Sequence, residues 1–447
     1  MENKFIRLAD LPPNPNNPEA LRHYKELGMN VCLLTEDQVK LVENGTVSEN
    51  YKQAIQNITD AGMQVWIRNM FNDPDYFECE ENKTGSNYGS PYKLEARQIT
   101  DEFAAFPGVT GFYMADEAYM YRLPEKVNID WMVKENHLFA SFDQLTKLVD
   151  WKNEHYPDAF FHMNHVPSAS WDHYLPRDGQ IYTYEDFLTA YCEVILKRLK
   201  GGKRSLCLDN YPLIGDNYLE KDYLFDLMTA AKVTRKYNAE AAPEDQAVFG
   251  ICLQTFEAKS MFDDRKRDIT MAEEVTLQMY TGMALGARLF EYFCYRSYEH
   301  EMFGILDPDG NDRIYDLVKA AGDRAAYFEP ILSRYDSAGG YMVPGSRYSF
   351  NTAAMVMARD LFAQPHEIAV SGEYDTLVGC FTGGKEKAYL LVNYTDPKRS
   401  CTSTVKLTAE GTQTLRLYQN GAESVLTAEN GTFTVTLEPG NAAFVVW

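Results

Sequence analysis

The chain has 447 residues, 45% of them hydrophobic, and a formal net charge of −22 at pH 7. This length exceeds that of an ordinary single-domain chain, and it allows a β/α barrel of about 250 residues together with a second domain. The negative charge argues against a nucleic-acid partner, because such binding depends on Lys and Arg that neutralise phosphates.

No stretch of the sequence approaches the ~20 consecutive apolar residues that a membrane helix needs. The first residues also lack the apolar segment of a secretory signal. We therefore expect no membrane partner and a cytoplasmic location, or secretion if a leader precedes this chain. The eight cysteines form no Cys-x-x-Cys pair, which predicts free thiols rather than disulfides or zinc ligands. Nothing in the sequence indicates an oligomeric state.

Short β-like runs alternate with longer helical runs through the first ~330 residues, a pattern typical of parallel β/α units. Eight such strands are predicted at 5–9, 30–34, 64–69, 109–118, 159–164, 204–211, 247–254 and 287–293. Helices are predicted at 19–27, 49–61, 94–106, 141–155, 184–199, 221–237, 272–285 and 315–327. Eight strand–helix units is the number found in a (β/α)₈ TIM barrel.

The sequence changes character from about residue 340. Short alternating runs follow one another, separated by turn signals such as Asn420-Gly421 and Asn430-Gly431. This pattern predicts an all-β sandwich of roughly 100 residues. We therefore expect a barrel domain over residues 1–338 and a C-terminal β-sandwich domain over residues 339–447.

The fourth predicted strand ends in two adjacent carboxylates, Asp116 and Glu117. Barrel enzymes carry their active sites at the C-terminal ends of the strands, so both residues are expected at the barrel mouth. Strand residues alternate between faces, and Phe112 and Met114 suit the face covered by helices. This alternation predicts that Glu117 points into the barrel. It aims Asp116 toward the barrel wall, as a support or cap.

Other strands bring further polar residues to the inward face. These are Asn164, Asp209, Gln254 and Glu291. The aromatic residues predicted near them include Trp66, Tyr113, Tyr211 and Tyr295. Sugars are bound by such mixtures of amides, carboxylates and rings. A single acid at a strand end is more often a helix cap or an ion-pair partner, and three acids at the ends of one barrel weaken that explanation.

No metal or cofactor is expected. His162 and His165 are three residues apart on a strand, so they should point to opposite faces, and ordinary hydrogen-bonded histidines are the better reading. The sequence also contains no glycine-rich phosphate loop, nucleophile elbow or Rossmann fingerprint.

Four segments, 111–117, 208–212, 253–256 and 279–293, resemble clan A-type glycoside hydrolases, and more narrowly the β-galactosidase-like barrel glycosidases of gut bacteria. The tail, with segments 391–393 and 437–440, is similar to the β-sandwich that follows such barrels. The resemblance spans nearly the whole chain. It implies a carbohydrate substrate, Glu117 as the acid/base, and a retaining mechanism with a nucleophile at the end of the seventh strand.

The chain departs from this pattern because Gln254 stands at the end of the seventh strand. Glu257, Glu291 and Asp209 are the other candidates for the second catalytic carboxylate. Another arrangement uses Asp116 as nucleophile and Asp209 as acid. The separation of the two carboxyl groups would distinguish a retaining from an inverting enzyme, at about 5–5.5 Å and about 6.5–9.5 Å respectively.

The sequence thus predicts a glycosidase in which Glu117 protonates the glycosidic oxygen. The residues predicted to bind substrate are Asp116, Asn164, Tyr211, Gln254, Tyr113, Trp66 and Tyr295. One alternative is a carbohydrate-binding protein on a barrel that has lost catalysis, which the missing glutamate of the seventh strand suggests. A barrel enzyme of other chemistry, such as a metal-dependent lyase or isomerase, is a further alternative.

Overall fold

A computed structural model defines the fold. It describes residues 5–35, 39, 42–43, 46–68, 108–116, 142–168, 183–214, 218–219, 221–258, 267–297, 302–349, 368–409 and 411–447. The helix predicted at 94–106 and Glu117 lie outside these described residues.

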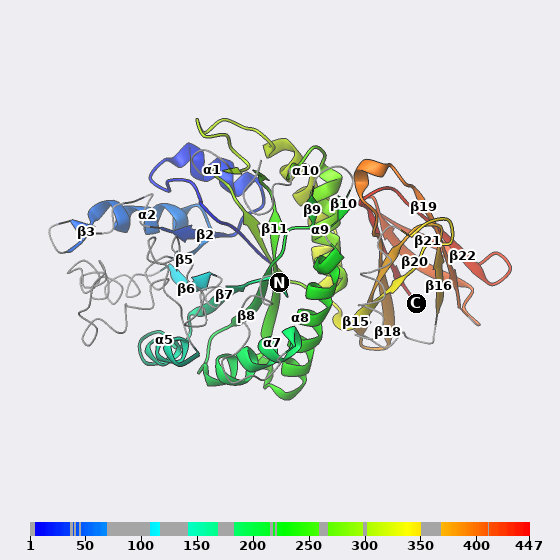
Figure 1. The fold of residues 1–447 in the computed structure, drawn as a ribbon, viewed down its shortest axis with the longest axis horizontal. Coiled ribbons are helices and arrows are strands. Elements are labelled where there is room, and N and C mark those ends of the chain that lie inside the picture. Colours follow the sequence, from blue (N-terminus) through cyan, green and yellow to red (C-terminus); the bar gives the residue numbers. More distant parts are fainter. Residues whose placement is uncertain are drawn as a thin grey trace, which may run out of the picture. The chain divides into compact units, whose positions relative to one another are not determined.

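Eight parallel strands form a single, nearly closed sheet, which confirms the predicted (β/α)₈ barrel (Figure 1). The strands are β1 (Ile6–Ala9), β2 (Val31–Leu34), β5 (Gln64–Arg68), β6 (Val109–Asp116), β7 (Phe160–His165), β8 (Arg204–Asp209), β11 (Ala247–Gln254) and β13 (Leu289–Phe293). Their order in the sheet is β1-β13-β11-β8-β7-β6-β5-β2. At the seam, the Asn30 amide donates to the Arg7 carbonyl at 3.1 Å, and the Arg7 amide donates to Asn30 Oδ1 at 2.9 Å.

The chain divides into two compact units. We call Arg7–Asp209 with Val233–Val248 the N-terminal unit. We call Met1–Ile6, Asn210–Lys232 and Phe249–Trp447 the C-terminal unit. The predicted domain boundary between residues 338 and 339 stays a prediction.

The N-terminal unit contains the following helices, and several of them begin at a capping side chain. They are α1 (Pro18–Glu26), α2 (Glu49–Asp60), α5 (Phe142–His155) and α7 (Tyr184–Val194), with short 3₁₀ helices η3 (Leu196–Arg198) and η4 (Pro243–Asp245) and a hairpin of β3 (Val42–Glu43) and β4 (Thr46–Val47). Asn17 caps α1 and Ser48 caps α2 through side-chain oxygens that accept backbone N–H groups. Thr183 and Asp186 form a reciprocal capping box at the start of α7. Such caps satisfy amides that have no partner within the helix.

Strand β7 shows how the two faces of the sheet are used. The ring of His162 lies 4.6 Å from that of Tyr113, on a neighbouring strand of the sheet. The ring of His165 instead packs edge-on against Tyr191 of α7, at 4.2 Å between centroids. The two histidines therefore point to opposite faces, as alternation predicts.

The C-terminal unit contains both helices and antiparallel sheets. Its helical part comprises α9 (Ala272–Ala284), α10 (Tyr315–Ala326) and α11 (Glu329–Leu332), while α8 (Lys221–Glu240) starts in it. A short hairpin pairs β9 (Leu213–Ile214) with β10 (Tyr218–Leu219), and a second two-stranded antiparallel sheet pairs β12 (Glu257–Ala258) with β14 (Met302–Phe303).

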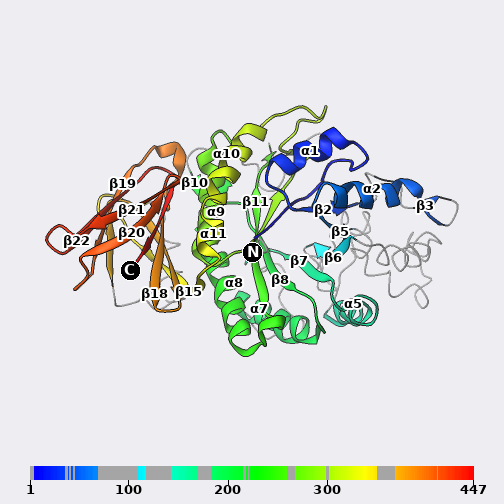
Figure 2. The same cartoon turned by 180° about the vertical axis from the view of Figure 1, so that it is seen from behind.

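A β-sandwich completes the C-terminal unit, as the sequence predicts (Figure 2). One sheet has the order β15-β17-β18-β23-β20-β21, and the other the order β16-β19-β22. Their bounds are β15 (Asp336–Val343), β16 (Ala369–Gly372), β17 (Thr376–Gly383), β18 (Glu386–Asn393), β19 (Ser403–Thr408), β20 (Thr414–Gln419), β21 (Ala422–Thr427), β22 (Thr432–Leu437) and β23 (Ala442–Val446), with a 3₁₀ turn η5 (Pro397–Arg399). Asn420 and Gly421 both adopt positive φ at the β20–β21 turn, the conformation that tight hairpins require.

Helix α9 is buried on both sides within this unit. A Cβ on Gly282 would meet Ile251 of β11 and Phe290 of β13, and one on Gly379 of β17 would meet the backbone of Ala284. Every residue of α9 except Glu273 is buried. A helix in such a position is expected to be largely apolar, because both of its sides leave water.

The described cysteines are all free thiols, and most are buried, as the sequence predicts. Cys79 lies outside the described residues. Among the helices that the structure describes, none has the length and hydropathy to cross a membrane.

The buried His165 makes stability depend on pH. Burial first, and the nearby His162 second, lower its pKa to about 3, against about 6.5 in the unfolded chain. Between these values only the unfolded chain binds the proton, so stability falls as pH falls, by up to about 1.4 kcal/mol per pH unit. We expect His165→Gln to flatten this dependence, measured by urea unfolding at about pH 7 and about pH 5. The exposed His155→Gln should leave the slope unchanged, and equal slopes in both variants would contradict the assignment.

Candidate active site

Charged and amide side chains meet at the C-terminal ends of strands in the N-terminal unit. Arg68 ends β5, Asp116 ends β6, Asn164 lies near the end of β7, and Asp10 directly follows β1. The C-terminal ends of parallel barrel strands surround one mouth, where barrel enzymes carry their sites. We call these four residues, with Tyr113, the Arg68 cluster.

Arg68 is the cation at the centre of this cluster. Its side chain is only 8% exposed, and it forms ion pairs with both Asp10 and Asp116, with Nη2 2.9 Å from Asp116 Oδ2. The guanidinium carbon also lies 4.5 Å from the centre of the Tyr113 ring. A charge can be buried when opposite charges and hydrogen bonds offset the loss of water, and two carboxylates do so here.

Asp116 receives three donors. Its Oδ1 accepts from the Tyr113 hydroxyl at 3.1 Å and from Asn164 Nδ2 at 3.3 Å, and its Oδ2 is paired with Arg68. Hydrogen bonds and a cation directed at a carboxylate stabilise its ionised form. In this arrangement Asp116 is suited to stabilising positive charge, and it is poorly suited to donating a proton.

The prediction that Asp116 points toward the barrel wall is wrong. In the parallel register between β6 and β7, Tyr113 lies opposite His162 and Asp116 lies opposite Asn164, with a register shift between Tyr113 and Ala115. His162 and Asn164 share a face, so Tyr113 and Asp116 share it too, although they are three residues apart. A β-bulge inserts one extra residue into a strand, and simple alternation then fails beyond it.

Glu117 lies outside the described residues, so its orientation stays a prediction. The alternation from which we predicted it runs through the bulge, and for Asp116 that alternation does not hold. The role of Glu117 therefore depends on chemistry and on the family resemblance rather than on counting residues from Gly111.

A layer of buried rings lies on the same face of the sheet as the Arg68 cluster. Trp66 and Tyr113 are fully buried, and each packs against His162, at 5.6 Å and 4.6 Å between ring centroids. Trp66 also stacks on Phe160 at 4.5 Å. These rings support the polar residues at the strand ends. The predicted role of Trp66 and Tyr113 in substrate binding stays a prediction.

Asn164 retains one oxygen that a ligand could use. Its Nδ2 donates to Asp116, and its side chain is almost fully buried. Among the described residues, no donor lies within hydrogen-bond distance of Asn164 Oδ1. Buried polar atoms normally have a partner, so this oxygen is placed to accept a hydrogen bond from a hydroxyl.

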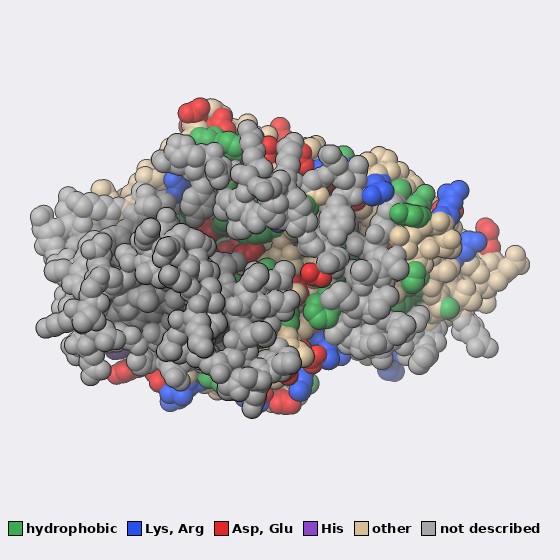
Figure 3. Space-filling view, viewed as in Figure 1, with side chains coloured by type: hydrophobic (Ala, Val, Ile, Leu, Met, Phe, Trp, Pro, Cys, Tyr) green, Lys and Arg blue, Asp and Glu red, His purple; other side chains and the backbone are tan. Residues whose placement is uncertain are grey.

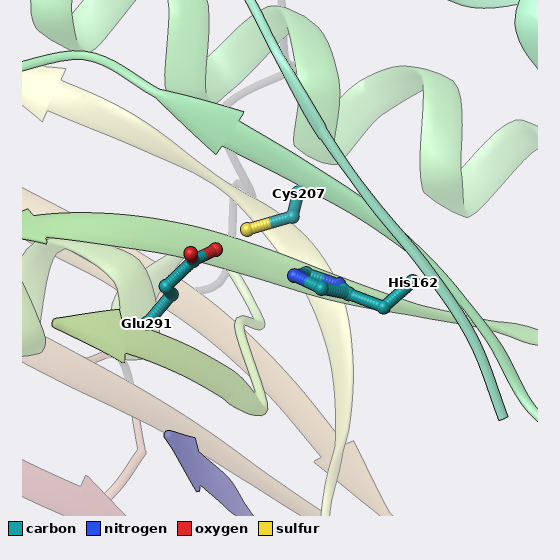
Figure 4. A group of neighbouring side chains, drawn as sticks. All are labelled: His162, Cys207 and Glu291. Atoms are coloured by element: carbon teal, nitrogen blue, oxygen red, sulfur yellow. The ribbon is translucent and has the colours of Figure 1, made fainter. Parts of the chain in front are cut away.

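The next strand contributes Cys207 and Asp209. Both are buried on β8, and they are two residues apart, so they share a face. Cys207 lies opposite Asn164 in the register between β7 and β8. Figure 4 draws Cys207 with His162, whose Nδ1 lies 2.8 Å from Ser205 Oγ, and it also labels Glu291 of the C-terminal unit.

In the C-terminal unit, Glu291 lies on the face of the barrel sheet that α9 does not cover. It lies opposite Cys252 in the parallel register of β11 and β13. The neighbouring Ile251 and Phe290 approach α9 instead, as does Tyr292, whose hydroxyl lies 3.8 Å from Met279 Sδ. Because neighbours along a strand point to opposite faces, Glu291 is directed away from the helix layer. Its carboxylate is buried.

Gln254, at the end of β11, is bound to backbone. Its Oε1 accepts from the Leu213 amide at 2.9 Å, and its Nε2 donates to the Leu213 carbonyl at 3.0 Å. The backbone of Gln254 is in turn hydrogen-bonded to the side chain of Gln278 in both directions. A carboxylate could not donate to the Leu213 carbonyl, so this local structure requires an amide at position 254.

Glu257 is engaged in an ion pair. Its Oε2 lies 3.0 Å from Arg313 Nη1, and Arg313 also donates to the carbonyls of Gly304 and Phe303. Both side chains are mostly buried. The guanidinium is thus fixed by three acceptors, and it holds Glu257 in one position.

Aromatic rings gather beyond β11 in the same unit. Tyr211 packs against Phe256 at 4.8 Å and against Phe293 at 5.8 Å between centroids. Tyr211 is half-buried, whereas Tyr295 is fully buried. Acidic side chains are visible near the middle of the face drawn in the space-filling view (Figure 3). The predicted roles of Tyr211, Gln254 and Tyr295 in substrate binding stay predictions.

Arg68 and Asp10 were missed by the sequence analysis. Both stand at strand ends that otherwise consist of buried residues. A charged residue in this position is the signal that could have identified them, because the C-terminal ends of barrel strands carry functional groups.

No protein-family model and no curated protein sequence matches the chain. Solved structures are similar to it. The α-amylase from Geobacillus thermoleovorans in complex with acarbose has 11% identity and a TM-score of 0.52, covering 100% of this chain and 98% of its own. A catalytic mutant of a family GH42 β-galactosidase from G. stearothermophilus has 10% identity and a TM-score of 0.52, with the same coverage.

A GH5 glycoside hydrolase from Bacteroides vulgatus has 10% identity and a TM-score of 0.51, covering 99% of this chain and 88% of its own. At such low identity these likenesses establish the fold alone. The chain therefore has the fold of these glycoside hydrolase structures, a (β/α)₈ barrel followed by a β-sandwich.

Proposed function

We propose that this protein is a glycoside hydrolase that works with paired carboxylates, in which Glu117 is the general acid/base. The observation that carries the proposal is the set of donors that surrounds the Asp116 carboxylate. Arg68, Tyr113 and Asn164 all direct donors at this carboxylate at the end of β6. The next residue in the chain, Glu117, is a second carboxylic acid. Because the charge of Asp116 is fixed by these donors, the two acids have different roles.

Glycoside hydrolysis requires this division of roles. The leaving oxygen must be protonated, and positive charge develops on the sugar ring in the transition state. An ionised Asp116 stabilises that charge, because fixed charges act strongly where water is excluded. It also disfavours ionisation of a neighbouring acid, which supports Glu117 as the proton donor. Asn164 Oδ1 supplies an acceptor for a sugar hydroxyl.

We assign Glu291 as the partner carboxylate, acting as the nucleophile of a retaining mechanism. Its buried side chain lies on a barrel strand and points away from helix α9, whereas Glu257 lies beyond the end of β11 and is fixed by Arg313. Asp209, buried at the end of β8, is the alternative partner. The amide of Gln254 is committed to Leu213, so the seventh strand supplies no nucleophile at this position.

Structures with the same fold support a glycoside as substrate. Three of them are described as an α-amylase, a β-galactosidase and a GH5 glycoside hydrolase. These descriptions do not agree on one substrate, so we do not propose a particular sugar. The fold accommodates many chemistries, and the assignment therefore depends on the Arg68 cluster together with the fold.

A second candidate is a carbohydrate-binding protein that does not hydrolyse its ligand. The observation that favours it is the pair of hydrogen bonds between Gln254 and Leu213, because they replace a catalytic group with a structural amide at the end of β11. Glycan binding without any turnover would favour this reading.

The first test is hydrolysis of a panel of nitrophenyl and dinitrophenyl glycosides by the wild-type chain. We expect Glu117→Gln to lower kcat/KM by about 10²–10⁴ on nitrophenyl glycosides, the usual contribution of a general acid. Dinitrophenyl glycosides should be affected less, because their leaving group departs without a proton.

Asp116→Asn should slow both classes of substrate alike, because it removes a charge rather than a proton donor. The exposed Glu19→Gln is the control and should be neutral. If Glu117→Gln slows both classes equally, or neither, Glu117 is not the acid.

The partner carboxylate can be identified by chemical rescue. Replacing the nucleophile of a retaining enzyme by alanine leaves space for an added anion such as azide, which then attacks the sugar in its place. We expect azide to restore turnover to Glu291→Ala and to give a glycosyl azide, with product anomers followed by NMR. Matched variants Asp209→Ala and Glu257→Ala should not be rescued. Rescue of either one instead, or inversion by the wild type, would overturn the assignment of Glu291.

A further inference from the structure

The C-terminal unit contains a pocket of about 770 Å³, and none of the predicted catalytic residues lines it. Helices α9 and α10 and the residues after α10 form one side, and the loops β18–β19, β20–β21 and β22–β23 of the sandwich form the other. All lining residues belong to the C-terminal unit. A volume of this size is typical of small-molecule sites.

Aromatic rings line the helical side of the pocket. Tyr280 and Phe328 are buried and pack edge-on at 5.5 Å between centroids. Tyr327 packs against Phe328 at 5.2 Å and is half-buried. Its ring is therefore held in place from behind while part of it remains accessible. A fixed aromatic face of this kind binds the C–H face of a sugar ring at little cost in side-chain entropy.

Polar groups on the sandwich side are already oriented by partners. Asn420 Oδ1 accepts from Asn441 Nδ2 at 2.8 Å, which fixes the Asn420 amide. Glu438 Oε2 accepts from the Thr402 hydroxyl at 2.7 Å. Asn420 Nδ2 and Glu438 Oε1 have no hydrogen-bond partner in the part of the chain that the structure describes, so they offer a ligand one donor and one acceptor group. Such preorganisation reduces the cost of binding.

The charges around the pocket select against anions. Its lining contains three acidic residues, Glu273, Asp323 and Glu438, and one basic residue, Arg324. Arg324 is paired with Glu273 at 2.7 Å, so its charge is already compensated. A phosphate or sulfate group would meet net negative charge. A neutral ligand with many hydroxyl groups can use both the amide and the carboxylate without paying that repulsion.

We propose that this pocket is a second carbohydrate-binding site, which takes a neutral mono- or oligosaccharide stacked on Tyr327 and hydrogen-bonded to Asn420 and Glu438. The choice of a saccharide rests on the proposed glycosidase function, whereas the location and the chemistry rest on the pocket itself. Such a site would hold a polymeric or oligomeric substrate on the protein without taking part in catalysis.

Binding to the full chain carrying Glu117→Gln tests the proposal, because this background is expected to bind glycans without degrading them. Maltotetraose, cellotetraose, xylotetraose and β-1,4-galactotetraose are titrated by calorimetry. We expect at least one of them to bind, and Tyr327→Ala to weaken one binding component about tenfold or more. Tyr348→Ala is the matched control, since Tyr348 is an exposed tyrosine of the same unit that does not line the pocket, and it should have no effect.

A second variant covers the case in which Tyr327→Ala does not fold. Asn420 has a φ of 51°, which glycine also adopts readily, so Asn420→Gly removes the amide and keeps the turn. It should weaken the same component. Binding that neither variant changes, or the absence of binding by all four saccharides, overturns the proposal.

The two proposals can fail separately. Turnover of glycosides by the wild-type chain, with saccharide binding unchanged by Tyr327→Ala and Asn420→Gly, would remove the second site and leave the glycosidase. The opposite result would be a loss of saccharide binding in both variants together with no hydrolysis of any glycoside by the wild-type chain. It would support the second site and contradict the glycosidase function.

Discussion

The buried guanidinium of Arg68 is the interaction on which the polar end of the N-terminal unit depends. Arg68 is nearly inaccessible to water, and its charge is tolerable only because Asp10 and Asp116 both pair with it. The cation joins the residue after β1 to the ends of β5 and β6. Asp116 is in turn linked to β7 through Asn164. One charge therefore sets the positions of the functional groups on four strands.

The bulge in β6 makes this arrangement geometrically feasible. Without it, Asp116 would alternate away from Tyr113 and could not accept the hydroxyl hydrogen bond or reach Asn164. With one residue inserted before Ala115, Asp116 comes opposite Asn164. Bulges re-aim side chains in this way and are frequent next to active sites. The register shift places Asp116 where it can pair with Arg68, and this ion pair in turn stabilises the shifted register.

In the C-terminal unit, amides and a buried helix take the place of charges. Gln254 and Gln278 form hydrogen bonds with backbone that link β11, the β9 segment and α9. Helix α9 also packs against the sandwich, where Thr276 donates to the Gly440 carbonyl and Ala284 approaches Gly379. The same helix thus covers the last barrel strands and one side of the sandwich. This shared packing explains why those strands and the sandwich form one compact unit.

The sequence by itself determined the element types and their order. Period-two runs such as 247–254, glycine-terminated helices and the Asn420-Gly421 turn act locally, so eight barrel strands, the sandwich and the opposite faces of His162 and His165 could all be predicted. The inward position of Glu291 also followed from alternation. The tertiary structure decided what depends on distant partners: the pairing of Arg68 with Asp10, the bond between Gln254 and Leu213, and the inward turn of Asp116. A bulge and an ion pair both depend on the register between strands, and register is fixed by the neighbouring strand rather than by the local sequence.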